Sequence, residues 1–80
     1  MTGEITVYAT TWCPYCLVLT RSLGRAGIAF TEVDIGKHPD AARLVASLNG
    51  GNETVPTVVL PDGTALTNPS VREIRAALVG

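Results

Sequence analysis

The sequence predicts an α/β domain in which a four-stranded mixed sheet is flanked by three helices, in the order β-α-β-α-β-β-α. Three observations support this fold class. Short runs rich in β-branched residues alternate with stretches whose apolar residues recur at helical spacing. The first two of these runs are separated by one helical stretch, as in parallel strands joined by a crossover helix. The last two are separated by Pro-Asp-Gly-Thr at residues 61–64, which indicates an antiparallel hairpin.

The first half of the chain is predicted to form a strand, a helix and a second strand. Residues 5–9 are rich in β-branched and aromatic side chains, and residues 28–35 alternate apolar with polar side chains, as a half-buried strand does. Pro14 suits the first turn of the intervening helix, where a missing N–H is not needed, and the helix is expected to stop near Gly27. Its apolar stripe consists of Cys16, Leu19, Leu23 and Ala26.

The second half is predicted to form a helix and then a hairpin. Residues 38–40 (His-Pro-Asp) resemble a helix start, and the apolar residues that follow keep helical spacing up to Asn-Gly-Gly-Asn at residues 49–52. Residues 57–60 and 65–67 are the expected antiparallel strands on either side of the Asp-Gly turn.

A final helix is predicted at the end of the chain, with apolar residues at Val71, Ile74 and Leu78. Two N-terminal caps compete for its start. Asn68 can cap with Pro69 at the first helical position, or Ser70 can cap with Glu73 as its capping-box partner. The sequence leaves this choice open.

Length and charge narrow the classes of function. Residues 1–80 are expected to form one domain, since a chain of this length has room for a single core. The net charge is −1 and the basic residues are spread along the chain, so no nucleic-acid partner is expected. No stretch has the length of a membrane span, and the N-terminus lacks the features of a signal peptide. We therefore expect a cytoplasmic protein without membrane contact, and a monomer because no long apolar stripe is left exposed.

The chain has two cysteines, Cys13 and Cys16, within the stretch Thr-Thr-Trp-Cys-Pro-Tyr-Cys. Three interpretations compete for this pair. A zinc site needs about four ligands, and beyond the pair the chain offers a single histidine, His38. A structural disulfide in so short a ring removes little unfolded-state entropy and would not persist in the reducing cytosol. A redox-active pair is the interpretation that best accounts for the position of these residues.

The predicted helix start explains how the two cysteines differ. Cys13 would lie at the helix N-terminus, where unpaired backbone N–H groups and the helix dipole favour a thiolate, the nucleophile of disulfide exchange. Cys16 would lie one turn inside the helix on the apolar stripe, where desolvation raises the pKa of a thiol. We therefore assign attack to Cys13 and, where it occurs, resolution to Cys16.

These motifs resemble those of a known family. The stretch Thr-Trp-Cys-Pro-Tyr-Cys after a first strand, together with Thr-Val-Pro-Thr at residues 54–57, is similar to a glutaredoxin of the thioredoxin fold over nearly the whole chain. The resemblance implies a thiol–disulfide oxidoreductase. It also implies that Pro56 is a cis proline beside the reactive cysteine, where the backbone at Val55 pairs with an extended thiol substrate. Pro14 and Tyr15 stand between the cysteines, with Tyr15 expected to project toward the bound thiol.

Two departures from the glutathione-using members of that family concern the small thiol. Those members usually carry a lysine three residues before the first cysteine and a Gly-Gly-Asp-like stretch before the last helix; here these places hold Thr10 and residues 67–70 (Thr-Asn-Pro-Ser). This segment, with Asn-Gly-Gly-Asn upstream, resembles the mycoredoxins, which work with mycothiol. By the chemistry of that family, mycothiol carries no carboxylate, so hydrogen-bonding residues should hold it. The residues suited to this are Thr10, Thr57, Thr67, Asn68 and Ser70, and each has an alternative role as a helix cap or strand former.

Trp12 precedes the cysteine pair and has two interpretations, shaping the thiol site or packing as a partly buried side chain. The expected activity is reduction of mixed disulfides between mycothiol and proteins, with mycothiol as co-substrate, an NADPH-dependent mycothiol disulfide reductase as electron source and no bound cofactor or metal. Three alternatives remain: a glutathione-dependent glutaredoxin, a thioredoxin-reductase-fed redoxin that serves ribonucleotide reductase, and an iron–sulfur cluster carrier.

Overall fold

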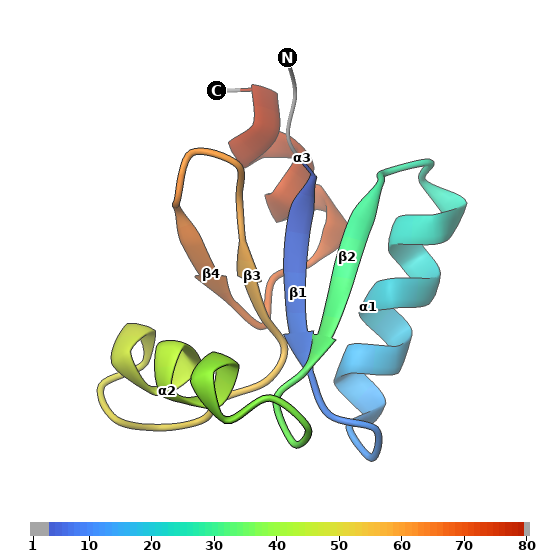
Figure 1. The fold of residues 1–80 in the computed structure, drawn as a ribbon. Helices are drawn as coiled ribbons and strands as arrows, with labels where there is room; N and C mark the ends of the chain where they lie inside the picture. The colour runs from blue at the N-terminus through green and yellow to red at the C-terminus, as the bar shows by residue number, and fades with distance from the viewer. Residues whose placement is uncertain (1–3, 80) are drawn as a thin grey trace.

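The computed structural model describes residues 4–79 and has the predicted order of elements (Figure 1). Its helices and strands are β1 (Ile5–Ala9), α1 (Pro14–Arg25), β2 (Phe30–Asp34), α2 (Pro39–Leu48), β3 (Thr57–Val59), β4 (Ala65–Thr67) and α3 (Val71–Val79). None of the helices in this part of the chain is long and apolar enough to cross a membrane.

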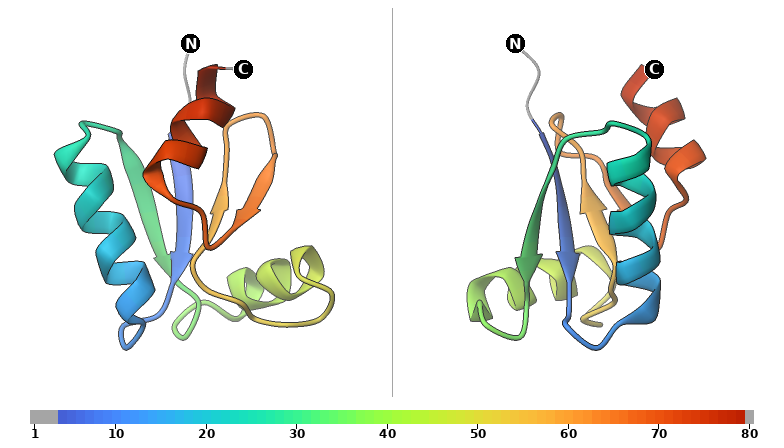
Figure 2. Two further views of the ribbon diagram at one scale, coloured as in Figure 1. Left: turned by 180° about the vertical axis from the view of Figure 1, so that it is seen from behind. Right: turned by 90° about the vertical axis from the view of Figure 1, so that its right-hand side faces the viewer.

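The four strands form one mixed sheet in the order β2-β1-β3-β4. β1 is parallel to β2, from the pair Ile5 and Phe30 onward, and antiparallel to β3, and β3 and β4 form the antiparallel hairpin. Figure 2 shows α1 and α3 on one face of the sheet and α2 on the other, near the end where β1 and β2 finish. The loop from β1 to α1, which carries the first cysteine, lies at this same end (Figure 1).

The core lies between the sheet and the layer formed by α1 and α3. Alternate residues of β1 are buried, as the two-residue period of a strand requires. The buried cluster contains Ile5, Val7, Ala9, Cys13, Cys16, Leu19, Leu23, Val58, Leu60 and Ile74. Both cysteines therefore belong to the edge of the core rather than to a detached loop.

Two predicted strands prove shorter in the structure, and each has a local reason. Residues 28–35 were predicted as a strand, but β2 spans Phe30–Asp34 because the Ile28 N–H still completes the end of α1 by bonding to the Leu23 carbonyl. Residues 57–60 were predicted as a strand, but β3 ends at Val59. The Leu60 N–H bonds to the Thr64 carbonyl to close the hairpin turn, in which Gly63 has a φ of +93°.

The structure also decides between the two possible caps of α3. The Ser70 backbone N–H donates to Glu73 Oε1 at 2.9 Å, and the Glu73 N–H donates to Ser70 Oγ at 3.1 Å. This reciprocal pair is a capping box, so Ser70 caps the helix. Asn68 does not: it has a φ of +47°, and its N–H donates to the Pro56 carbonyl at 2.8 Å. Asn68 thereby ties the start of α3 to the segment before β3.

Candidate functional site

Cys13 is the N-cap residue of α1. Its backbone is extended, Pro14 occupies the first turn of the helix, and the Cys13 Sγ accepts the Cys16 N–H at 3.1 Å. The sulfur thus takes the place of the oxygen that usually caps a helix and receives one of the N–H groups that the first turn leaves unpaired. A hydrogen bond of this kind and the positive end of the helix dipole both stabilise negative charge on Cys13.

Cys16 lies one turn further along and faces the core. It is 1% exposed, compared with 6% for Cys13. Burial, followed by the hydrogen bond with Cys13, raises the pKa of the Cys16 thiol from 9.0 to about 12. Cys16 is therefore a neutral thiol near neutral pH. The structure thus confirms the predicted positions of the two cysteines, one at the helix start and one on its buried face.

The exposed part of Cys13 faces a pocket of about 400 Å³ between the start of α1 and the edge strand β2. Its lining consists of Thr10, Thr11, Trp12, Cys13, Pro14, Cys16, Leu17 and Glu32. A smaller pocket of about 180 Å³ adjoins it, because Thr10, Thr11 and Glu32 line both. Trp12 and Tyr15, next to the cysteines in the sequence, are exposed by 77% and 67%. Trp12 is therefore not a packing residue.

Thr10 is one of the three residues that line both pockets. Its carbonyl accepts the Cys13 N–H at 3.4 Å, which fixes the turn before α1. Its hydroxyl oxygen is buried, and no other residue in the range 4–79 offers it a hydrogen bond. A buried hydroxyl without a partner is uncommon, and Thr10 also lines the pocket that contains Cys13.

A second group of predicted residues lies on the other side of β1. The Val55–Pro56 peptide bond is cis, as the family resemblance implied. Because Thr57 at the start of β3 pairs with Tyr8 near the end of β1, Pro56 lies at the same end of the sheet as the cysteine loop. Val55 packs against the buried cluster that contains both cysteines.

Thr57 and Thr67 use their hydroxyl groups inside the protein. Thr57 is fully buried, donates to the Thr54 carbonyl at 2.7 Å and accepts from Asn49 Nδ2 at 3.1 Å. Thr67 Oγ1 donates to Asn49 Oδ1 at 2.7 Å. The Ser70 hydroxyl caps α3, as described above. Of the five polar residues proposed to hold the thiol, these three therefore have structural partners.

The predicted site residues thus form two groups at one end of the sheet. The group on the β2 side of β1 lines the larger pocket and consists of Thr10, Trp12, Cys13, Pro14 and Cys16. The group on the β3 side includes the cis proline and the segment that leads into α3, and it consists of Val55, Pro56, Thr57, Thr67, Asn68 and Ser70. Tyr15 is exposed at the first turn of α1 and lines neither of the two pockets described.

Comparison with known proteins identifies the family. The family model described as Glutaredoxin matches residues 5–65, which is most of the chain and includes both cysteines and the cis proline. The chain belongs to the glutaredoxin family. It is a glutaredoxin-like redox protein, and this membership supports thiol–disulfide exchange as its general chemistry.

Relatives of known name agree with this assignment. A Mycobacterium tuberculosis protein named as a candidate glutaredoxin, Rv3198A, is 52% identical over 79 residues, covering 99% of this chain and 94% of its own. Mycoredoxin 1 of Corynebacterium glutamicum is 42% identical over 76 residues, covering 95% of this chain and 94% of its own. The crystal structure of a glutaredoxin from Archaeoglobus fulgidus has a TM-score of 0.78 and 24% identity, covering 96% of this chain and 87% of that one. This likeness shows that the two proteins share a fold.

Two residues of this glutaredoxin-family site were not singled out in the sequence. Asn49 was interpreted as part of a helix stop, yet its side chain joins α2 to β3 and β4. Glu32 was interpreted as an ordinary polar position of a strand, yet it lines both pockets. A signal for Glu32 was present, because the two-residue period of β2 puts Glu32 and Asp34 in the same register as the apolar Phe30.

The unequal cysteines lead to a labelling prediction. When the reduced protein is treated with iodoacetamide at about pH 8, we expect one adduct, on Cys13, because alkylation requires a thiolate and burial keeps Cys16 protonated. Intact mass counts the adducts, and fragmentation of the peptide that contains both cysteines locates them.

The matched control for this labelling is the Cys13→Ser protein. We expect it to remain unlabelled while folded and to gain one adduct, on Cys16, after unfolding in urea. Rapid labelling of Cys16 in the folded protein would contradict the assignment of unequal roles.

Proposed function

We propose that this protein is a thiol–disulfide oxidoreductase that removes mycothiol from mixed disulfides with proteins, with Cys13 as the nucleophile. The observation that carries this proposal is the position of Cys13 Sγ as the cap of α1, where it accepts the Cys16 N–H and faces the pocket. Attack on a disulfide needs a sulfur nucleophile that the substrate can reach, and Cys13 Sγ lies at the helix N-terminus beside this pocket.

The first step is attack of the Cys13 thiolate on the mycothiol sulfur of the mixed disulfide. A bond forms between Cys13 and mycothiol, the original S–S bond breaks, and the protein thiol leaves with the electron pair. A second mycothiol thiolate then attacks the same mycothiol sulfur, which frees Cys13 and forms mycothiol disulfide. An NADPH-dependent flavoprotein reductase returns that disulfide to thiol. In this route the neutral Cys16 takes no covalent part.

Three observations support an uncharged thiol as the co-substrate. Among the described residues that line the two pockets, none is a lysine or an arginine that would pair with a carboxylate. The larger pocket is lined instead by Thr10 and Thr11, whose residue type can hydrogen-bond a neutral polar ligand. The similarity to mycoredoxin 1 extends over 95% of this chain and is therefore not confined to the cysteine motif.

The test is an assay of NADPH consumption with a mixed-disulfide substrate. One reaction contains mycothiol and mycothiol disulfide reductase, and the other contains glutathione and glutathione reductase. We expect turnover with mycothiol and a rate lower by at least about tenfold with glutathione, since its two carboxylates find no cation at this pocket. Cys13→Ser is the control for background exchange.

Equal or faster turnover with glutathione would overturn the assignment of mycothiol and leave a general glutaredoxin. Failure of both reactions, with the protein folded and Cys13 reduced, would overturn the proposed exchange chemistry itself.

A further inference from the structure

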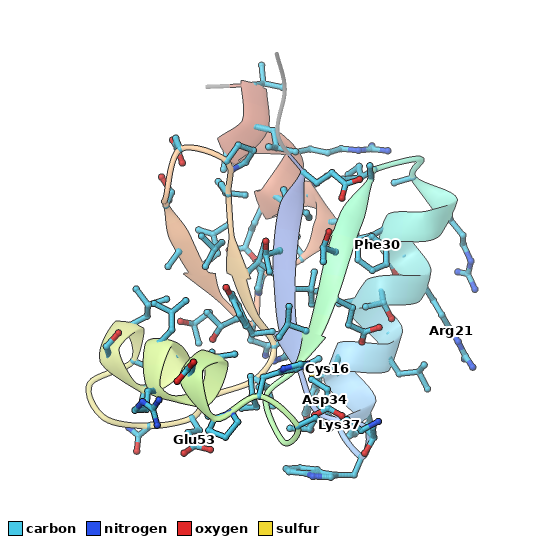
Figure 3. All side chains as sticks on the ribbon, viewed as in Figure 1. Cys16, Arg21, Phe30, Asp34, Lys37 and Glu53 are labelled. Carbon is cyan, nitrogen blue, oxygen red and sulfur yellow. The ribbon has the colours of Figure 1, made fainter. Side chains whose placement is uncertain are left out.

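The edge strand β2 places two carboxylates beside the reactive cysteine. Phe30, Glu32 and Asp34 share one face of β2 because side chains alternate along a strand. Phe30 packs against the buried cluster, whereas Glu32 is exposed and Asp34 is half-buried. Phe30 is the first residue of β2 and Asp34 the last, and Figure 3 shows Asp34 toward the end of the sheet that also holds Cys16. On this face of β2, the apolar Phe30 is thus followed by two acidic residues, Glu32 and Asp34, at the end of the strand near the site.

Both carboxylates belong to the walls of the pockets described above. Glu32 lines the larger pocket together with Cys13 and Cys16, and it lines the smaller one together with Asp34. The charge of Glu32 also acts on Cys16: after burial and the contacts with Cys13, it is a further cause of the raised pKa of the Cys16 thiol. A disulfide that approaches Cys13 from this side therefore enters a field of negative charge.

Nothing in the described part of the chain neutralises these carboxylates. The ion pair found among residues 4–79 joins Arg43 to Asp40 on α2. The Glu32 carboxylate makes no hydrogen bond or ion pair with a described residue, and the Asp34 carboxylate accepts only the Gly36 N–H, at 2.8 Å. Lys37 follows closely in the sequence but forms no ion pair with Asp34 and lines neither pocket.

We propose that Glu32 and Asp34 make the β2 side of the site select against anionic disulfides, so that the half of the substrate that enters there is neutral or cationic. This inference rests on the proposed exchange at Cys13. Beyond the lack of a lysine or arginine among the described residues that line the pockets, the two carboxylates would repel an anionic substrate. Like charges at a partly exposed site disfavour one another, and opposite charges attract, by amounts that salt reduces. The polypeptide segment that best fits this pocket carries a basic residue next to its disulfide-bonded cysteine.

The experiment measures one chemical step with three small symmetrical disulfides of similar size. Cystamine carries two positive charges, hydroxyethyl disulfide is neutral, and dithiodipropionate carries two negative charges. In a Cys16→Ser background, the Cys13 thiolate attacks one sulfur, forms a stable mixed disulfide and releases one thiolate. The rate of mixed-disulfide formation is followed by intact mass and divided by the rate with the neutral disulfide, which removes general effects on Cys13.

We expect Glu32→Gln to raise the relative rate with the anionic disulfide about threefold and to lower it with the cationic one by a similar factor, at low ionic strength. Added salt should shrink both changes. Asp34→Asn is the second variant, with the same expected direction, and its side-chain oxygen can still accept the Gly36 N–H. The matched control is Glu4→Gln. It changes the net charge equally, but Glu4 precedes β1 at the opposite end of the sheet, where it accepts the Thr31 hydroxyl.

The outcomes separate the two proposals. Unchanged relative rates in both variants, or equal changes in the Glu4→Gln control, would overturn the selection by Glu32 and Asp34 while leaving exchange at Cys13 intact. Absence of any mixed disulfide at Cys13 with all three reagents would overturn the proposed function, and this inference with it.

Discussion

Replacement of Cys13 by serine is expected to abolish thiol–disulfide exchange, whereas replacement of Cys16 is expected to retain most of it. The loss in Cys13→Ser should exceed about a hundredfold, because a serine hydroxyl supplies neither a thiolate nor a sulfur that can form a disulfide. Cys16→Ser should stay within about threefold of the original rate. The bond to Cys13 Sγ comes from the Cys16 backbone N–H, which the substitution leaves in place.

The measurement is the NADPH-coupled rate with a mycothiol mixed disulfide, together with urea unfolding of each variant. Cys16 is buried, so Cys16→Ala serves as a second variant that places no hydroxyl in the core. Loss of turnover in both folded Cys16 variants would show that Cys16 resolves the intermediate, and the route would then pass through a Cys13–Cys16 disulfide.

Replacement of Asn49 by alanine is expected to lower the free energy of unfolding by about 2–3 kcal/mol, a large share of the stability of a small domain. The Asn49 amide donates to the Val45 carbonyl at 2.8 Å and to Thr57 Oγ1 at 3.1 Å, and it accepts from Thr67 Oγ1 at 2.7 Å. The substitution removes all three bonds and leaves the fully buried Thr57 without that donor. Urea unfolding followed by circular dichroism measures the change.

Asn52→Ala is the matched control for this prediction. Asn52 is exposed, and its side chain donates a single bond of 3.3 Å to the Asn49 carbonyl. We expect a change of less than about 0.5 kcal/mol, as is usual for surface positions. Similar losses in the two variants would show that the loop after α2 is sensitive as a whole and that the Asn49 side chain has no special part in joining the strands.

Features that depend on neighbours in the chain were predicted from the sequence. The spacing of Cys13, Pro14 and Cys16 was enough to place one cysteine at a helix start and the other on the apolar stripe, since a helix repeats every 3.6 residues. The Asp-Gly pair at residues 62–63 predicted the hairpin, and the structure has Gly63 in the left-handed region within that turn. The element order and the parallel pairing of β1 with β2 follow from the same local patterns.

The ends of the strands required the folded chain. Whether Ile28 and Leu60 continue a strand depends on which carbonyl their N–H groups reach: for Ile28 it is that of Leu23 in α1, and for Leu60 that of Thr64 across the hairpin turn. The choice of Ser70 over Asn68 as the cap of α3 has the same origin. Asn68 adopts a left-handed conformation, and its N–H donates to the carbonyl of Pro56, a residue outside the helix.

The sequence by itself determined that two cysteines stand at the start of a helix in an α/β domain, the first at the helix cap and the second on its apolar stripe. Only the tertiary structure decided what surrounds them. The Asn49 side chain bonds to Thr67 across 18 residues of chain, and Glu32 lines the same pocket as Cys13 because β2 pairs beside β1. Periodicity specifies which face of an element a residue occupies, but the partner on that face is set by how distant segments pack together.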